Sequence, residues 1–328
     1  MIDFLSIRNS FDKYKDVPSK KILGKTREKD PLISIVIPTF RRPDTLKDSI
    51  TSALNQKNFD DYIVIVVDNE NEENTETEKL LKSYKDDKLY YYKNQENIGM
   101  TGNWNRCIEL AQGKWLTLLH DDDKLLPDFL CNMLKAIKEN ENIEMLTSQV
   151  VICNDENVNI VEQENCKFSI EKVSKIKDEQ YVLGNISPAP GILIKKENAI
   201  KLGGFNDDEY PCADYMFWIT YHLHYGSYIY KQSLALYRMA ELNTTKNVYK
   251  NIIDKSYEIK KNYITMVVEN SYKKNFLMNN GMLNIINAYK NYMSEKEFNE
   301  IMDKYRVKNN LLNKGLCFTY RVIRKLGL

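Results

Sequence analysis

Two short runs of apolar, β-branched residues with one helix-length segment between them constrain the fold of this chain most strongly. Residues 33–37 and 62–67 are almost continuously apolar, which is typical of strands buried on both faces of a parallel sheet. Residues 44–54 lie between them and carry their apolar side chains at helical spacing. Parallel strands joined through a helix form a β-α-β unit, so residues 33–67 predict the start of an α/β sheet.

The same alternation continues along the chain. Helical patterns at 76–84 and 101–111 alternate with strand patterns at 89–92 and 115–119, and further strands are expected at 145–152 and 191–194. A helix is expected from Asp214 to Tyr225, ended by Gly226, and after residue 247 the spacing is helical almost throughout. Ser294 and Glu297 have the spacing of a capping box. The fold class predicted is a doubly wound mixed α/β sheet with a C-terminal helical appendage.

Three regions are expected from these patterns. Residues 1–30 are polar and lysine-rich without a sustained period, and we interpret them as a leader or short helix before the first strand. Residues 31–245 form the α/β domain, with halves at 31–130 and 131–245, and residues 246–328 form the helical region.

Composition narrows the class of protein. Forty-seven basic and 46 acidic residues give a net charge of +1, which argues against a nucleic-acid partner held by bulk electrostatics. No signal-peptide pattern and no run of about 18 apolar residues occurs, so we expect a cytoplasmic protein. The six cysteines include no C-x-x-C pair, which favours reduced thiols.

An apolar strand at residues 116–119 leads directly into His120 and three adjacent carboxylates, Asp121, Asp122 and Asp123. Adjacent carboxylates repel one another, so the cluster favours a hard divalent cation. An exposed acidic turn without a ligand is an equal alternative from these residues alone. Because ligands of open α/β sheets bind at the carboxyl ends of the strands, Thr39, Asp68 and Asp121–Asp123 are expected to share one rim. Neither G-x-G-x-x-G nor a Walker motif is present.

Several segments, in this order, resemble glycosyltransferase family 2. The segments are Ile35-Val36-Ile37-Pro38-Thr39-Phe40-x-Arg42, Val66-Val67-Asp68, Asn97-x-Gly99 with Asn105, the acidic strand end with Pro127, Gly191-Ile192-Leu193-Ile194, Gly203-Gly204-Phe205 and Ala213-Asp214-Tyr215. The resemblance covers about residues 32–245 and implies the Rossmann-like GT-A fold, with residues 31–130 as the nucleotide-sugar half and 131–245 as the acceptor half.

The resemblance also implies roles for individual residues on the donor side. Pro38, Thr39 and Phe40 would lie along the base and ribose, and Asp68 would accept a hydrogen bond from the imide of uracil, which suits a UDP-sugar. The other donor-side assignments are Asp122 for a divalent metal, Mn²⁺ or Mg²⁺, Asp121 for ribose or sugar hydroxyls, Asp123 for the sugar or a water on the metal, Arg238 for the phosphates, and Arg42, Asn97, Gly99 and Asn105 for the remaining nucleotide-sugar contacts.

Asp214 is the candidate catalytic base. From the residues alone, a helix N-cap without chemistry is as good an interpretation, because Asp is a favoured cap. The resemblance implies that Asp214 takes the proton of an acceptor hydroxyl, in one displacement that inverts the anomeric carbon. The function implied is a metal-dependent inverting transferase that acts on a glycan, lipid-linked or protein-linked glycan acceptor, in the style of bacterial surface polysaccharide synthesis.

The chain departs from the family pattern at three positions. His120 stands where Asp is common, Ala213 where Glu is frequent, and Ala240 where a histidine can reach the metal or diphosphate. His120 either contacts substrate or only ends the strand. These departures keep a second hypothesis open, namely a catalytically silent nucleotide-binding or scaffolding partner of another glycosyltransferase. A nucleotidyltransferase would need a glycine-rich loop after the first strand, and Pro-Thr-Phe-Arg-Arg lacks it.

The last residues suggest two further contacts. After Asp303 the charged side chains are all basic, and Leu312, Leu316, Ile323 and Leu326 give the expected final helix an apolar side. Such a helix either lies on anionic lipid, which would make the protein peripheral at the membrane, or packs on the core with a solvated basic face. The long helical appendage is also a plausible surface for a homodimer.

Overall fold

The computed structural model describes residues 2–153, 173–187, 189–239 and 245–308. Within these residues the chain forms a ten-stranded sheet. The strands are β1 (Ser19–Leu23), β2 (Ile33–Thr39), β3 (Tyr62–Asp68), β4 (Leu89–Asn94), β5 (Trp115–Leu118), β6 (Lys124–Leu125), β7 (Met145–Cys153), β8 (Val173–Lys175), β9 (Ile192–Lys195) and β10 (Tyr228–Arg238).

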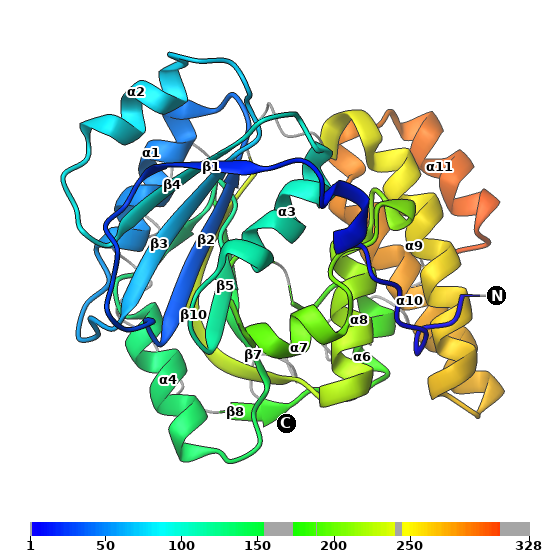
Figure 1. Cartoon of the computed structure of the whole chain (residues 1–328). Coiled ribbons are helices and arrows are strands. Elements are labelled where there is room, and N and C mark those ends of the chain that lie inside the picture. The colour runs from blue at the N-terminus through cyan, green and yellow to red at the C-terminus, as the bar shows by residue number, and fades with distance from the viewer. Residues whose placement is uncertain (1, 154–172, 188, 240–244, 309–328) are drawn as a thin grey trace.

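Helices cover both faces of the sheet and continue beyond it (Figure 1). They are α1 (Pro43–Leu54), α2 (Glu76–Ser83), α3 (Gly99–Leu110), α4 (Phe129–Glu139), α6 (Gln180–Leu183), α7 (Lys196–Lys201), α8 (Ala213–Tyr225), α9 (Thr245–Val267), α10 (Ser271–Ala288) and α11 (Glu295–Lys304), with short 3-10 turns η1 (Phe11–Tyr14), η2 (Asp207–Glu209) and η3 (Lys290–Tyr292).

The strand order is β1-β4-β3-β2-β5-β9-β7-β10-β6, with β8 paired to β10. Strands β4, β3, β2 and β5 are parallel to their neighbours in that run, and β7 and β10 are also parallel. Strand β9 joins the two runs by antiparallel pairing with β5 and β7. The mixed, doubly wound α/β sheet predicted from the sequence is confirmed.

Alternate residues of the central strands enter two separate hydrophobic cores. Ile35 and Ile37 of β2 pack with α1, α2 and α4, whereas Val36 packs with α3, α7 and α8. Figure 1 shows these two sets of helices on opposite faces of the sheet. Every residue of β2 and β3 is buried, which explains why the two strands appear as continuous apolar runs in the sequence.

The N-terminal region differs from the expectation. The sequence indicated no strand before residue 32, and this was wrong, because β1 pairs antiparallel with β4 at the edge of the sheet. The residues of β1 are Ser-Lys-Lys-Ile-Leu, and their burial does not alternate, so neither an apolar run nor the two-residue period of a half-buried strand marks this segment. Arg106 of α3 holds the segment in place by donating to the carbonyls of Tyr14 and Val17.

Strand β10 was also missed by the sequence analysis. Its residues are Tyr-Ile-Tyr-Lys-Gln-Ser-Leu-Ala-Leu-Tyr-Arg, with a polar middle at Lys231, Gln232 and Ser233. The pairing of β10 with β7 shifts register on both sides of Ser233. The irregularity removes the simple two-residue period by which a strand is recognised.

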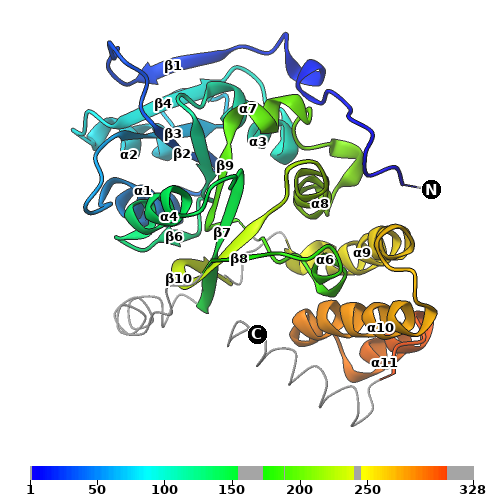
Figure 2. The same cartoon turned by 90° about the horizontal axis from the view of Figure 1, so that it is seen from below.

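The helical region predicted after residue 247 is present as α9, α10 and α11. Figure 2 shows the three helices side by side, next to α6 and apart from the sheet. Ile259, Tyr263 and Ile264 of α9 belong to the same core as α8, so the helices are joined to the domain by a common core. The capping box of Ser294 and Glu297 is confirmed at the start of α11.

The predicted basic amphipathic end lies mostly outside the described residues. Lys314, Arg321, Arg324 and Lys325 belong to 309–328, and of the earlier basic residues Lys304 pairs with Asp254. The part of the chain that the structure describes holds no helix of the length and apolarity that crossing a bilayer requires. Its cysteines Cys107, Cys131, Cys153 and Cys212 are free thiols. The domain boundaries and the dimer stay predictions.

Candidate active site

A cavity of about 510 Å³ opens at the carboxyl ends of β2 and β5 and extends to the C-terminal helices. We call one wall the strand-end side: it comprises Pro38, Thr39, Phe40, Arg42, Asn97 and Gly99, with His120, Asp121 and Asp122 of the acidic turn (His120–Asp123). The opposite wall is the helical side, made by Val248, Ile252, Ser256 and Lys260 of α9 and by Ile285 and Tyr289 at the end of α10. Asp214 lies in the same cavity, at the start of α8.

The predicted rim is present in part. Thr39 at the end of β2 donates a hydrogen bond from Oγ1 to Oδ2 of Asp121, over 2.8 Å. The Arg42 guanidinium lies 3.1 Å from a carboxylate oxygen of Asp122 and 3.5 Å from one of Asp121. Residues of the first strand-turn unit and of the acidic turn, which are 80 positions apart, therefore form one charged cluster. The acidic turn faces a cavity and is not an exposed surface turn.

Three side chains of the acidic turn can hold a cation. One ligand atom from each of His120, Asp122 and Asp123 lies within 4.8 Å of the other two. Within the described residues, Nε2 of His120 and Oδ2 of Asp123 are buried without a hydrogen-bond partner, which is costly unless a ligand satisfies them. The carboxylate oxygens suit Mn²⁺ or Mg²⁺, whereas Mg²⁺ prefers oxygen ligands alone, so a set that includes the His120 imidazole favours Mn²⁺. The residues present therefore fit the predicted metal, and they add His120 and Asp123 to Asp122.

Burial controls the protonation of this turn. It raises the pKa of Asp121 to about 6, with a further increase from Asp122 and opposing contributions from Arg42 and Thr39. Burial lowers the pKa of His120 below its usual value, so the neutral imidazole is favoured, as metal ligation requires. The ring of His120 stacks on Trp104 with a centroid separation of 5.5 Å. His120 thus does more than end the strand: its ring forms part of the cavity wall.

One end of the strand-end side is bounded by Pro38, Phe40, Asn97 and Gly99. Phe40 is 39% exposed and offers its ring to the cavity. Oδ1 of Asn97 accepts hydrogen bonds from Asn69 and from the backbone N–H of Gly99. Gly99 has a φ of +72°, a backbone conformation that residues other than glycine rarely adopt. Glycine is therefore favoured where α3 begins.

Two predicted donor residues do not reach the cavity. Asp68 is fully buried, and its carboxylate accepts hydrogen bonds from the Tyr91 hydroxyl and the Glu70 N–H. Burial raises the pKa of Asp68 to about 6. The Asn105 amide donates to the carbonyl and accepts from the N–H of Phe205, so it joins α3 to the loop after α7. Both positions lie next to the cavity lining but serve contacts within the fold.

Arg238 ends β10 and lines the cavity between the two walls. Its guanidinium pairs with Asp48 of α1 over 2.6 Å, and its backbone N–H donates to Oδ1 of Asp123 over 2.9 Å. The second bond holds Asp123 in the acidic turn. Arg238 therefore contacts the predicted metal cluster through its main chain, whereas its side chain reaches toward α1.

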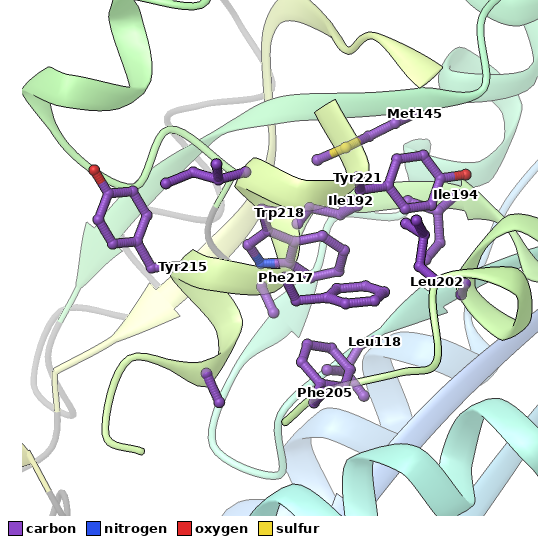
Figure 3. Close-up of a cluster of buried hydrophobic side chains, with 14 of the residues drawn as sticks. Leu118, Met145, Ile192, Ile194, Leu202, Phe205, Tyr215, Phe217, Trp218 and Tyr221 are labelled. Carbon is purple, nitrogen blue, oxygen red and sulfur yellow. The ribbon is translucent and has the colours of Figure 1, made fainter. Parts of the chain in front are cut away.

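Asp214 is the second residue of α8, whose N-cap is Cys212, so the N-cap interpretation of Asp214 is wrong. One oxygen of Asp214 accepts from the Asn185 amide over 2.9 Å. Burial in the cavity wall raises the pKa of Asp214, against stabilisation of the carboxylate by backbone N–H groups at the helix start. Figure 3 shows Phe217 and Trp218, on the same helix, packed with Phe205, with ring centroids of Phe217 and Phe205 4.4 Å apart. This core fixes the position of Asp214.

Sequence reasoning missed the helical side. The sequence analysis noted no stripe at residues 248, 252, 256 and 260, because their types (Val, Ile, Ser, Lys) do not differ from those of an ordinary helix. The four-residue spacing itself was the available signal, since residues i and i+4 share one helix face. Asn185, the partner of Asp214, lies in a loop without a recognisable motif.

The family was found by comparison with known proteins. The sequence model described as "Glycosyl transferase family 2" matches residues 34–197, half of the chain. The chain belongs to this family. Membership makes the protein a glycosyltransferase, and the resemblance stated above is confirmed.

Two curated relatives agree with this family, and one solved structure agrees with the fold. An uncharacterised glycosyltransferase of Methanocaldococcus jannaschii is 33% identical over 58% of this chain, a match that spans 64% of the relative. The GalNAc(5)-diNAcBac-PP-undecaprenol β-1,3-glucosyltransferase of Campylobacter jejuni is 27% identical over 74% of this chain and 79% of its own length. The structure of S. aureus TarS 1–349 in complex with UDP-GlcNAc superposes with a TM-score of 0.60 at 13% identity, over 84% of this chain and 80% of that one, which supports the GT-A fold.

Proposed function

We propose that this protein transfers a sugar from a UDP-sugar to a hydroxyl of a glycan or lipid-linked acceptor in glycan biosynthesis, with the help of a divalent cation. The observation that carries the proposal is the shared cavity of Asp122 and Asp214, a cation-binding turn and a carboxylate base from distant parts of the chain. A direct transfer requires that donor and acceptor meet in one cavity, with the reacting atoms next to each other.

The donor nucleotide would lie on the strand-end side. Pro38 and Phe40 offer an apolar surface for the base, and Asn97 and Gly99 border the same region. Uridine is the proposed base because the family resemblance implies it and because the similar TarS structure contains UDP-GlcNAc. Asp68 and Asn105 have no place in this proposal, since their side chains bond within the fold.

A divalent cation, Mn²⁺ or Mg²⁺, would be held by Asp122 with His120 and Asp123. When bound, it would neutralise charge on the donor diphosphate, and it would stabilise the departing nucleotide more than the ground state. Arg42 contacts Asp122 and Asp121, so its guanidinium is placed to turn toward the diphosphate once a cation occupies the carboxylates.

Asp214 would act as the general base. Its carboxylate takes the proton of the acceptor hydroxyl while that oxygen forms a bond to C1 of the sugar and the bond from C1 to the phosphate oxygen breaks. One displacement inverts the anomeric configuration. The raised pKa of Asp214 makes it a stronger base than an exposed aspartate, and the Asn185 amide orients it.

Thermal stability with nucleotides tests the donor site directly. The protein is heated with UDP, GDP, CMP or dTDP, each with Mn²⁺ or with EDTA, and compared with Asp122→Asn. A UDP-selective increase in Tm that needs Mn²⁺ and is lost in Asp122→Asn is the expected result. The matched control is Asp60→Asn, which neutralises an aspartate whose side chain is 95% exposed and pairs with Lys88. Equal shifts in both variants, or no shift with any nucleotide, would contradict the proposal.

A further inference from the structure

The helical side of the cavity changes character along α9. Val248, Ile252, Ser256 and Lys260 follow one another at four-residue intervals and all line the cavity. The stripe therefore runs from two apolar side chains to a hydroxyl and then to an amine. Ile285 and Tyr289 complete this wall. A ligand that fits it has an apolar or ring surface at one end and a charged or polar group at the Lys260 end.

Lys260 is 1% exposed, and its ammonium group is held in place. The Nζ atom donates to the carbonyl of Val182 over 2.9 Å and to the hydroxyl of Tyr215 over 3.1 Å. It also lies 4.8 Å from the centroid of the Tyr215 ring. Gly281 of α10 packs against this point, since a Cβ there would be 2.2 Å from the Val182 oxygen and 3.4 Å from the Lys260 side chain.

No carboxylate pairs with Lys260 among the residues that the structure describes. Lys93, which is similarly buried, pairs with Glu78 over 3.0 Å. Lys255 lies on the same helix and pairs with Glu209 over 2.9 Å. Burying an ammonium group without an anion is unfavourable, and Lys260 differs from Lys93 and Lys255 because no carboxylate among the described residues offsets this cost. Burial accordingly lowers the pKa of Lys260 to about 7.

An ammonium group has three N–H donors, and two of those of Lys260 have partners within the described residues. An anion in the cavity would supply both the third hydrogen bond and the missing negative charge. Ser256 is one turn away on the same face and offers a hydroxyl. Tyr215, which contacts Lys260, is the neighbour of Asp214 in the chain, so the anion would lie on the acceptor side of the proposed base.

We propose that Lys260 and Ser256 form an anion-binding subsite on the helical side, which takes a phosphate group of the acceptor. This inference rests on the proposed function, because it treats the helical side as the acceptor wall. The phosphate would anchor the acceptor so that its sugar hydroxyl faces Asp214. The subsite is separate from the acidic turn, which belongs to the donor.

The test compares an anionic and a neutral probe on the same protein sample. Glucose 1-phosphate and methyl α-glucoside are titrated into the full-length protein after the donor site has been filled with UDP and Mn²⁺, and ligand-observed NMR gives both affinities. Glucose 1-phosphate is expected to bind at least tenfold more tightly. Filling the donor site keeps the phosphate of the probe away from the cation.

Two variants assign the preference to Lys260. Lys260→Gln should abolish the tenfold difference and leave the UDP affinity unchanged. Lys255→Gln removes the same charge from the same helix, at a residue that is already paired with Glu209. This variant should keep the tenfold difference between the affinities for the two probes. The inference is overturned if the wild-type protein binds both probes equally, or if Lys260→Gln retains the preference. If Lys260→Gln does not fold, Ser256→Ala replaces it in the test. Ser256→Ala is expected to weaken the binding of glucose 1-phosphate and to leave the binding of methyl α-glucoside unchanged. An unchanged preference for glucose 1-phosphate in that variant overturns the inference.

The two proposals fail in different ways. If UDP and Mn²⁺ do not bind, the proposed donor site is wrong, and the comparison of the two probes without UDP still decides the anion subsite. If UDP binds and the probes do not differ, only the anion subsite is wrong.

Discussion

The two sides of the cavity are built in contrasting ways. On the strand-end side, functional side chains follow directly after buried strands, and charged groups lie close to opposite or like charges, as in the Arg42 contacts with Asp121 and Asp122. On the helical side, one face of α9 supplies the lining, and the buried ammonium of Lys260 has no carboxylate partner among the described residues. The strand-end side is therefore assembled from segments far apart in the sequence, whereas the helical side depends on how one helix docks onto the domain.

The largest effect is expected at the point where the two sides meet. Asp214→Asn keeps the hydrogen-bonding shape but removes the base, so transfer should slow by about 100- to 10,000-fold. UDP affinity should stay within about twofold, because the proposed contact of Asp214 is with the acceptor hydroxyl and not with the nucleotide. Initial rates and calorimetric UDP titration measure the two quantities. An unchanged rate would remove Asp214 from the mechanism and favour another base.

Two neighbouring isoleucines on α10 allow the effect of core packing to be separated from the effect of lining the cavity. Ile286 is fully buried, and Ile286→Ala should lower the free energy of unfolding by about 2–5 kcal/mol. Ile285 lines the cavity and is only partly buried, so Ile285→Ala should cost less stability and instead raise the KM for acceptor. Urea unfolding and acceptor titrations distinguish the pair. If Ile285→Ala changed the donor KM and not the acceptor KM, the assignment of the helical side would be wrong.

The pH dependence of stability should have opposite signs for two buried ionisable groups, Asp68 at the end of β3 and Lys260 on the helical side. Asp68 has a pKa raised to about 6, so its folded form takes up a proton before the unfolded form does, and stability gains about 1–2 kcal/mol as pH falls from 6 to 4. Lys260 has a pKa lowered to about 7, so the folded form releases a proton first, and stability rises with pH above 7.

Asp68→Asn and Lys260→Met should each remove one of these slopes. Urea unfolding at several pH values, expressed as the difference from wild type, measures them. For Asp68→Asn, the free energy of unfolding relative to wild type should change between pH 4 and pH 6. If it did not change, the Asp68 carboxylate would not be buried as described.

The smallest effect compares two cavity glycines. Gly99→Ala forces alanine to a φ of +72°, so it should cost about 1 kcal/mol although no atom lies within 4 Å of the new Cβ. Gly184 also has open space around its Cβ position but an extended backbone, so Gly184→Ala should cost less. Thermal denaturation of both variants measures the difference, and equal costs would argue against strain at Gly99.

The contrast also explains what could be predicted from the sequence. Buried parallel strands have no polar face, so β2, β3 and the residues at their ends were recognisable from local patterns. The edge strand β1 and the irregular β10 lack that signal, and sequence position does not show that the side chains of Asp68 and Asn105 make hydrogen bonds within the fold. The helical side depends on the docking of α9 and α10 against α8, which is set by long-range packing.

A crystal structure with UDP and Mn²⁺ would test the central claim most directly, because manganese can be located by its anomalous signal. We predict a manganese peak beside Asp122, within reach of His120 or Asp123, with uridine along Pro38–Phe40 and the helical side left open. Nucleotide bound against α9 and α10, or manganese away from the acidic turn, would contradict the division of the cavity into a donor side and an acceptor side.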